Sequence, residues 1–205
     1  MMRRHLTANC RVGFVSIGVL ILVAGCLGRS PNVRLFTLGS QAQLERSERA
    51  PDLAVLIGPV RLPSYLERPQ IARRLGGGEV ELDEFNRWVG GFEENLIRAL
   101  TDGIRRQLGS VRVVGYPSQA PFPMDYRVRL HVDELIVDES NLLRAQLRWA
   151  IVSKVKGEAP SLSSFERDIA AGSGSIEALV EAHDRVLSEL AERIADQLVA
   201  QVEAR

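Results

Sequence analysis

Few side chains in this sequence could do acid–base, nucleophilic or metal chemistry, since it holds three histidines and two cysteines. His131 stands between Leu130 and Val132 in an alternating stretch, so its side chain is expected to face solvent from a strand. His131 and Asp133 could supply two members of a hydrolytic triad, but nothing in the sequence selects a serine. The pattern favours strand charges that face solvent.

The other candidates for chemistry are weaker. His183 falls on the apolar side of a C-terminal helical pattern, where a hydrogen-bonded histidine at the edge of the core is favoured over a metal ligand. The glycine run at 76–78 lacks the lysine or helix start that a phosphate-binding loop needs, and no G-x-S-x-G or G-x-G-x-x-G motif is present. The sequence therefore predicts no metal and no cofactor, and it does not support an enzyme.

The N-terminus has the pattern of an export signal. Arg3, Arg4 and Arg11 precede an uncharged apolar run over residues 12–24. As a helix this run would be roughly 20 Å long, well short of the roughly 30 Å hydrocarbon core. A secretory signal is therefore favoured over a permanent transmembrane helix.

Small residues at the end of this run resemble the bacterial lipobox, with Val23, Ala24 and Gly25 directly before Cys26. The resemblance implies cleavage between Gly25 and Cys26, a diacylglycerol on the Cys26 sulfur and acylation of the new amino group. An ordinary signal peptide with an incidental cysteine is the alternative. Because each buried methylene contributes about 0.8 kcal/mol, two or three long chains would hold the protein on a membrane.

These features predict three parts: a signal peptide at 1–25, a lipidated tether at 26–32 and one exported domain at 33–205. Cys10 would leave with the signal, so the domain would have no thiol. The full chain has equal numbers of acidic and basic side chains and no basic block, which argues against nucleic acid as a partner. Leu27 stands where enteric lipoproteins retained at the inner membrane have aspartate, which favours the outer membrane.

Strand patterns occupy much of the predicted domain. Residues 53–62 form an apolar run in which Pro59 would be tolerated at an edge or a bulge. The alternation in residues 126–138 changes parity near Asp133 and Glu134, which predicts a bulge. Residues 138–141 should form the turn of a hairpin with the next strand. Further strands are predicted at 33–39, 111–117, 143–151 and, as a short piece, within 164–175.

Two helical patterns accompany these strands. The first is predicted to start at Asp83 as N-cap and to end at Gly109, with a kink or a close approach to the sheet at the glycine pair 90–91. The second is predicted from Ile176, with Ser175 as N-cap. The expected fold is α+β, with a single largely antiparallel sheet packed by two long amphipathic helices.

One linked motif identifies a family. Residues 63–71 contain a proline, Tyr-Leu, an arginine and Gln-Ile in order, and a tryptophan-bearing amphipathic stretch follows. This arrangement resembles the PqiC-like family of ABC-type transport auxiliary lipoproteins of membrane-integrity systems. The resemblance extends from about Val33 over nearly the whole exported part. Phe36 stands where the family usually has tyrosine.

The resemblance implies a non-catalytic, periplasm-facing lipoprotein of the outer membrane. Its partner would be an MCE-domain protein that moves lipids between the two membranes, and a phospholipid is a further candidate ligand. A hydrolase or a small-ligand sensor of the envelope is the alternative. The candidate docking residues are Pro63, Tyr65, Leu66, Arg68, Pro69 and Gln70.

Two questions about this segment stay open in the sequence. Tyr65 and Leu66 could instead pack the turn onto the sheet. Arg68, Arg73 and Arg74 could contact anionic lipid or simply solubilise a loop.

Overall fold

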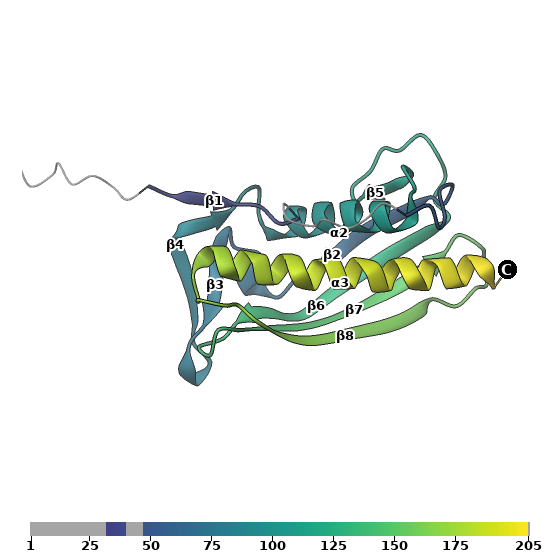
Figure 1. The fold of residues 1–205 in the computed structure, drawn as a ribbon. Helices are drawn as coiled ribbons and strands as arrows, with labels where there is room; N and C mark the ends of the chain where they lie inside the picture. The colour runs from purple at the N-terminus through teal and green to yellow at the C-terminus, as the bar shows by residue number, and fades with distance from the viewer. Residues whose placement is uncertain (1–31, 40–46, 205) are drawn as a thin grey trace, which may run out of the picture. The chain divides into compact units, whose positions relative to one another are not determined.

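Two α-helices, α2 (Phe92–Leu108) and α3 (Ile176–Glu203), pack against one side of an eight-stranded sheet in the computed structural model (Figure 1). The structure describes residues 32–39 and 47–204. The predicted signal peptide, the lipobox and Cys26 lie outside the described residues. No helix within the described ranges is both long and apolar enough to cross a membrane.

The sheet follows the order β1-β4-β3-β6-β2-β5, with β7 paired to β6 and β8 paired to β7. Two short 3-10 turns, η1 (Ser64–Leu66) and η2 (Gly76–Gly78), precede β3 and β4. The strands are β1 (Arg34–Phe36), β2 (Val55–Arg61), β3 (Gln70–Arg74), β4 (Val80–Trp88), β5 (Val113–Gly115), β6 (Tyr126–Val137), β7 (Leu142–Ser153) and β8 (Ser161–Ala170).

The sheet is mixed, so the prediction of a largely antiparallel sheet was wrong. β1 pairs with β4 in parallel, and β2 runs parallel to both β5 and β6. The antiparallel pairs are β3–β4, β6–β7 and β7–β8. Between β2 and β5 the chain passes through η1, β3, β4 and α2, and a crossover of this kind returns the chain in the same direction.

The predicted helix start at Asp83 was also wrong. Residues 80–88 form β4, and α2 begins only at Phe92 after Gly90 and Gly91, whose φ values of 69° and 96° are left-handed. A right-handed helix cannot continue through two residues with left-handed φ values. Glycine adopts this left-handed conformation at little steric cost. The apolar spacing across residues 85–92 therefore belongs to a strand followed by a turn.

Asp83 makes cap-like hydrogen bonds inside the strand. Its Oδ1 accepts hydrogen bonds from the backbone N–H groups of Phe85 at 2.9 Å and Asn86 at 3.0 Å. The register of β4 against β3 shifts at this point, between Gln70 and Ile71. The aspartate that signals a helix start in the sequence thus caps a bulge.

Other local predictions are confirmed. Residues 138–141 connect β6 and β7 as an antiparallel hairpin, and the register shifts between Val132 and Glu134, where the bulge was expected. A second shift, between Ile57 and Val60, lies beside Pro59 in β2. Helix α3 begins at Ile176.

The Ser175 side chain accepts a hydrogen bond from the N–H group of Ala178 at 3.2 Å, which confirms it as the N-cap of α3. This bond satisfies one of the helix N–H groups that have no partner within the helix.

The core between the helices and the sheet includes a cluster of three rings. His183 is buried, and its ring centroid lies 5.7 Å from that of Trp88 and 6.0 Å from that of Phe92. Its Nδ1 is 2.8 Å from the carbonyl oxygen of Leu179, to which the neutral ring donates. Burial lowers the pKa of His183 to about 4, so it is a neutral, hydrogen-bonded core residue at pH 7.

Polar side chains of both helices hold the segment after β1. Asn95 accepts a hydrogen bond from the Leu38 N–H at 3.2 Å and donates one to the Val89 carbonyl at 2.5 Å. Asp184 accepts one from the Gly39 N–H at 2.6 Å. The segment that follows β1 is therefore fixed to α2 and α3.

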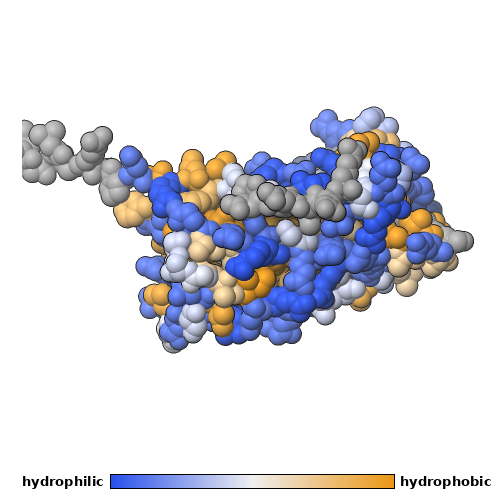
Figure 2. Space-filling view, viewed as in Figure 1, coloured by the Kyte–Doolittle hydropathy of each residue, from blue (hydrophilic) through white to orange (hydrophobic). Residues whose placement is uncertain are grey.

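Hydrophobic residues form several patches on the visible surface, one of them at the end where β1 begins (Figure 2). Among the exposed large hydrophobic residues are Val33 and Leu35, in and before β1, and Phe85 in β4.

Candidate functional site

The predicted docking segment is a short, well-ordered connection between β2 and β3. Pro63 precedes η1 with φ −67° and ψ 150°, and its carbonyl accepts a hydrogen bond from the Leu66 N–H at 2.9 Å. The pyrrolidine ring fixes φ near this value in any conformation. Part of the conformational entropy of the turn is therefore already lost in the unfolded chain.

Tyr65 and Leu66 point from this turn into the domain. Leu66 is only 4% exposed and belongs to the core. The half-buried Tyr65 hydroxyl accepts a hydrogen bond from the Leu135 N–H at 3.1 Å, and burial raises the pKa of this phenol. On that side of β6 the pairing with β2 ends at His131 and the pairing with β3 is at Val137. Tyr65 thus satisfies a strand N–H group in the gap, so packing the turn is one role of Tyr65 and Leu66.

Removing this hydroxyl should weaken the fold modestly. Tyr65→Phe is expected to lower the free energy of unfolding by about 1–2 kcal/mol, because the Leu135 N–H group loses its partner. Urea denaturation measures the change, and Tyr116→Phe is the matched control because Tyr116 is 44% exposed. Its expected loss is below about 0.5 kcal/mol. Equal losses in the two variants would contradict this role of Tyr65.

The second half of the segment returns to the sheet. The Pro69 carbonyl accepts a hydrogen bond from the Trp88 N–H at 2.7 Å, and the Gln70 amide lies 3.3 Å from a carboxylate oxygen of Glu84. Arg68 and Pro69 are exposed, and Arg68 makes no ion pair or hydrogen bond with the residues described here. Arg68 and Pro69 therefore form the outward part of the predicted segment.

The two other arginines of this region are half-buried and bound to groups of the domain itself. Arg73 donates to the Gly174 carbonyl at 2.8 Å and to the Asn141 side-chain oxygen at 2.6 Å. Arg74 forms an ion pair with Glu134. Arg73 and Arg74 therefore bind β3 to neighbouring turns and to β6.

A hollow of about 510 Å³ opens beside η1, between the end of β2 and the start of α2. Both signs of charge are present in its lining, from Arg61, Glu67 and Glu93. Its lining comprises Val60, Arg61, Leu62, Leu66, Glu67, Gly90, Gly91, Phe92 and Glu93.

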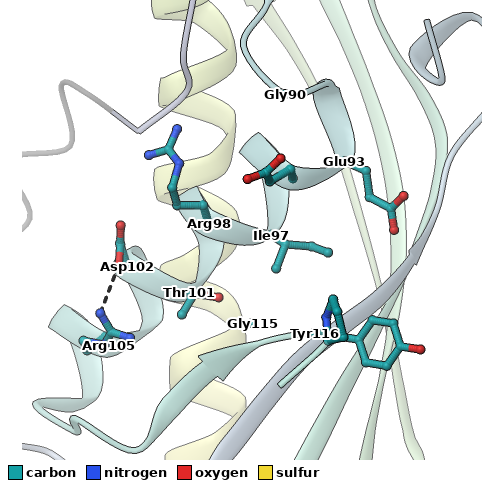
Figure 3. Close-up of a pocket in the computed structure, with 11 residues that line it drawn as sticks. Gly90, Glu93, Ile97, Arg98, Thr101, Asp102, Arg105, Gly115 and Tyr116 are labelled. Atoms are coloured by element: carbon teal, nitrogen blue, oxygen red, sulfur yellow. Dashed lines mark hydrogen bonds and ion pairs between the residues drawn. The ribbon is translucent and has the colours of Figure 1, made fainter. Parts of the chain in front are cut away.

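A second hollow, of about 660 Å³, shares Gly90 and Glu93 with the first (Figure 3). Ile97 and Thr101 from α2 line it, and Tyr116 lies across from them. Asp102 and Arg105 pair at 3.2 Å on its far side. Because both hollows are lined by the start of α2, they form one surface that adjoins η1. We call these two hollows, together with the exposed Arg68 and Pro69 of the adjoining turn, the turn surface; its charged members are Arg61, Glu67, Arg68 and Glu93.

Arg61, Glu67 and Glu93 were not predicted from the sequence. Glu93 lies 26 positions after Glu67, and the two approach each other only because α2 starts beside the end of β2. No sequence motif links Glu67 to Glu93, because residues 70–88 between them form a separate hairpin.

The histidine considered for hydrolysis lies elsewhere, on the outer side of β6. The Nε2 atom of His131 is 3.3 Å from Asp133, and Arg148 donates to Asp133 at 2.6 Å. These hydrogen bonds from Arg148 hold the pKa of the Asp133 carboxyl below its ordinary value. Ser164 lies opposite Arg148, which lies opposite His131, so the backbones at Ser164 and His131 are two strand spacings, about 10 Å, apart.

Among the described residues, no three histidine, cysteine, aspartate or glutamate side chains lie close enough together to hold a metal ion.

Comparison with known proteins identifies the family of the chain. A family model described as the ABC-type transport auxiliary lipoprotein component matches residues 36–195, which span β1 to most of α3. No curated protein matches the sequence.

Two solved structures share the fold at low sequence identity. An uncharacterised protein of known crystal structure superposes with a TM-score of 0.66 at 13% identity, over 82% of this chain and 99% of the other. A protein from Xanthomonas campestris of the DUF330 family superposes with a TM-score of 0.57 at 14% identity, over 86% of this chain and 98% of the other. At such identities these structures support the fold alone.

Proposed function

Because this chain belongs to the family of ABC-type transport auxiliary lipoprotein components, we propose that it docks a periplasmic MCE-domain partner of such a system at the outer membrane. In this proposal the chain carries no catalytic activity of its own. It is held on the membrane by lipid on Cys26, and the turn surface meets the partner.

The observation that carries the docking proposal is the exposed Arg68-Pro69 pair held between two fixed points. Leu66 anchors one side in the core, and the hydrogen bond from Trp88 to the Pro69 carbonyl anchors the other. Since the backbone is already ordered, little conformational entropy remains to be lost when a partner binds. Arginine is also a residue type enriched among the energetically dominant residues of interfaces.

The proposed anchor makes a weak docking surface sufficient. The seven residues from Cys26 to Asn32 reach at most about 25 Å when fully extended. A domain on so short a tether has a high effective concentration at its own membrane, so even a weak contact with the partner would be occupied. Leu27, in place of aspartate, supports the outer membrane as that location.

The hydrolase alternative draws no support from the described surroundings of His131. Its described partner is Asp133, and Arg148 occupies the position between the imidazole and Ser164. This arrangement lacks the hydrogen bond between nucleophile and base on which an activated serine depends.

Charge reversal at the turn surface should weaken docking. Arg68→Glu in the detergent-extracted full chain is expected to weaken capture of the MCE-domain protein at least about tenfold, since the exposed guanidinium is replaced by a carboxylate. Binding of the purified MCE-domain protein to the immobilised chain measures the change.

Lys156→Glu is the matched control, because it makes the same charge change in the exposed turn between β7 and β8. Equal binding by wild type and Arg68→Glu would remove the turn surface from the proposal. Capture of no MCE-domain protein by the wild type would overturn the docking function itself.

A further inference from the structure

The outer side of the sheet, away from the helices, carries a row of arginines. In β6 the side chains of Tyr126, Val128 and Leu130 face the core, so Arg127 and Arg129 between them face outward. Both arginines are exposed, and neither makes an ion pair or hydrogen bond with any described residue. Two guanidinium groups two residues apart on one face of a strand repel each other.

Apolar side chains lie beside this pair. Arg129 lies opposite Ala150 of β7, and Arg127 lies opposite Val152. Ala150 in turn lies opposite Leu162 of β8, whose side chain is 78% exposed. An apolar strip thus runs directly beside two unpaired positive charges. We call Arg127, Arg129, Ala150, Val152 and Leu162 the outer sheet face.

Two hollows lie along this face and share Arg129. One, of about 490 Å³, has outward-facing lining from Arg129, His131, Arg148, Ala150, Leu162 and Ser164. The other, of about 230 Å³, includes Arg127, Arg129, Val152 and Lys154.

The positive charge ends abruptly along the strands. Beyond Arg129, Arg148 is neutralised by Asp133, and on the other side Lys154 pairs with Asp125. Among the described residues of β6 and β7, the outward-facing arginines without an ion pair are therefore Arg127 and Arg129. This extent suits one compact anion, whereas an extended polyanion such as a nucleic acid would need a longer basic row.

We propose that the outer sheet face binds the phosphate headgroup of an anionic phospholipid. Arg127 and Arg129 would donate to the phosphate oxygens, which the planar guanidinium forks contact in bidentate geometry. Ala150, Val152 and Leu162 would cover the first methylenes of the acyl chains. The exposed leucine beside the charges favours a lipid over a fully polar anion. This site is separate from the turn surface and does not require the MCE-domain partner.

Native mass spectrometry of the full chain in an uncharged detergent tests the site. Phosphatidylglycerol is added at defined ratios, with phosphatidylcholine as the lipid of zero net charge. The wild type is expected to retain phosphatidylglycerol in preference to phosphatidylcholine. Replacing Arg127 and Arg129 with glutamine should reduce this retention at least about tenfold, because both phosphate donors are removed.

The matched control replaces Arg68 and Lys156 with glutamine, which removes two exposed positive charges elsewhere. This variant is expected to retain phosphatidylglycerol as the wild type does. Equal retention of both lipids by the wild type, or equal losses in the two double variants, would overturn the site.

Two further arms separate the sources of the anion. Inorganic phosphate at ten times the lipid concentration should leave phosphatidylglycerol bound, and its displacement would identify a free-phosphate site instead. A polyglutamate peptide that binds the wild type in place of phosphatidylglycerol would show that the face recognises an acidic protein segment. Either result overturns the lipid proposal.

Discussion

Replacing Trp88 with alanine is expected to lower the free energy of unfolding by about 3–5 kcal/mol. Trp88 is 3% exposed, and its ring packs 5.4 Å from that of Phe92 and 5.7 Å from that of His183. Phe85→Ala, three residues earlier in the same strand, should cost less than about 1 kcal/mol, because Phe85 is 48% exposed. Urea denaturation of the two variants gives the comparison.

The two variants also test whether residues 80–88 form a strand or the start of a helix. A helix starting at Asp83 would place Phe85 and Trp88 on one face, three positions apart, and the two substitutions would then have similar costs. In β4 the same positions lie on opposite faces, since side chains alternate along a strand. Comparable losses of stability would contradict the strand.

Stability is expected to fall as the pH drops from about 6.5 towards about 4, because of His183. Its pKa lies at about 4 in the folded chain, against 6.5 as the ordinary value, since burial disfavours the charged ring. Between these values the unfolded chain binds a proton that the folded chain does not, so folding loses stability as protons are added. At pH 5 the loss due to His183 amounts to about 2 kcal/mol relative to pH 7.5.

His183→Gln should remove this contribution, so the change in unfolding free energy between pH 7.5 and pH 5.0 should be about 2 kcal/mol smaller than in the wild type. Phe92→Leu is the matched control, because it perturbs the same ring cluster and leaves the histidine in place. The control should be less stable at both pH values yet keep the pH dependence of the wild type. An unchanged pH dependence in His183→Gln would contradict the burial of a neutral ring.

The parts of the fold that local chemistry encodes could be predicted from sequence. Ser175 before an apolar stripe gave the start of α3, and the parity change near Asp133 gave the bulge in β6. Both depend on residues within a few positions of each other. Asp83 misled the prediction because an aspartate that accepts hydrogen bonds from N–H groups two and three residues later looks the same before a helix and at a strand bulge.

The strand directions could not be predicted in the same way. The parallel pairing of β2 with β5 and β6 joins segments separated by η1, β3, β4 and α2, and each strand alone has the same apolar pattern in either orientation. The choice depends on how α2 covers the sheet, which is a tertiary property.

The candidate site could likewise be predicted only in part from the sequence. The sequence singled out residues 63–70, but it could not separate the residues that pack from those that face outward. That separation follows from the gap in the pairing of β6, into which the Tyr65 hydroxyl fits. The roles of Arg73 and Arg74 could not be predicted either, because their partners Asn141, Gly174 and Glu134 are distant in the sequence.

Site-specific photo-crosslinking in the intact envelope tests the docking function most directly. A photoreactive amino acid is placed at Glu67, which is exposed beside Arg68 and leaves that arginine intact, and in a second strain at Lys156, which is exposed on a different turn. A crosslink from position 67 to an MCE-domain protein is expected in the outer-membrane fraction, and none from position 156. If the crosslink from position 67 is absent, or no stronger than the one from position 156, the docking proposal is contradicted.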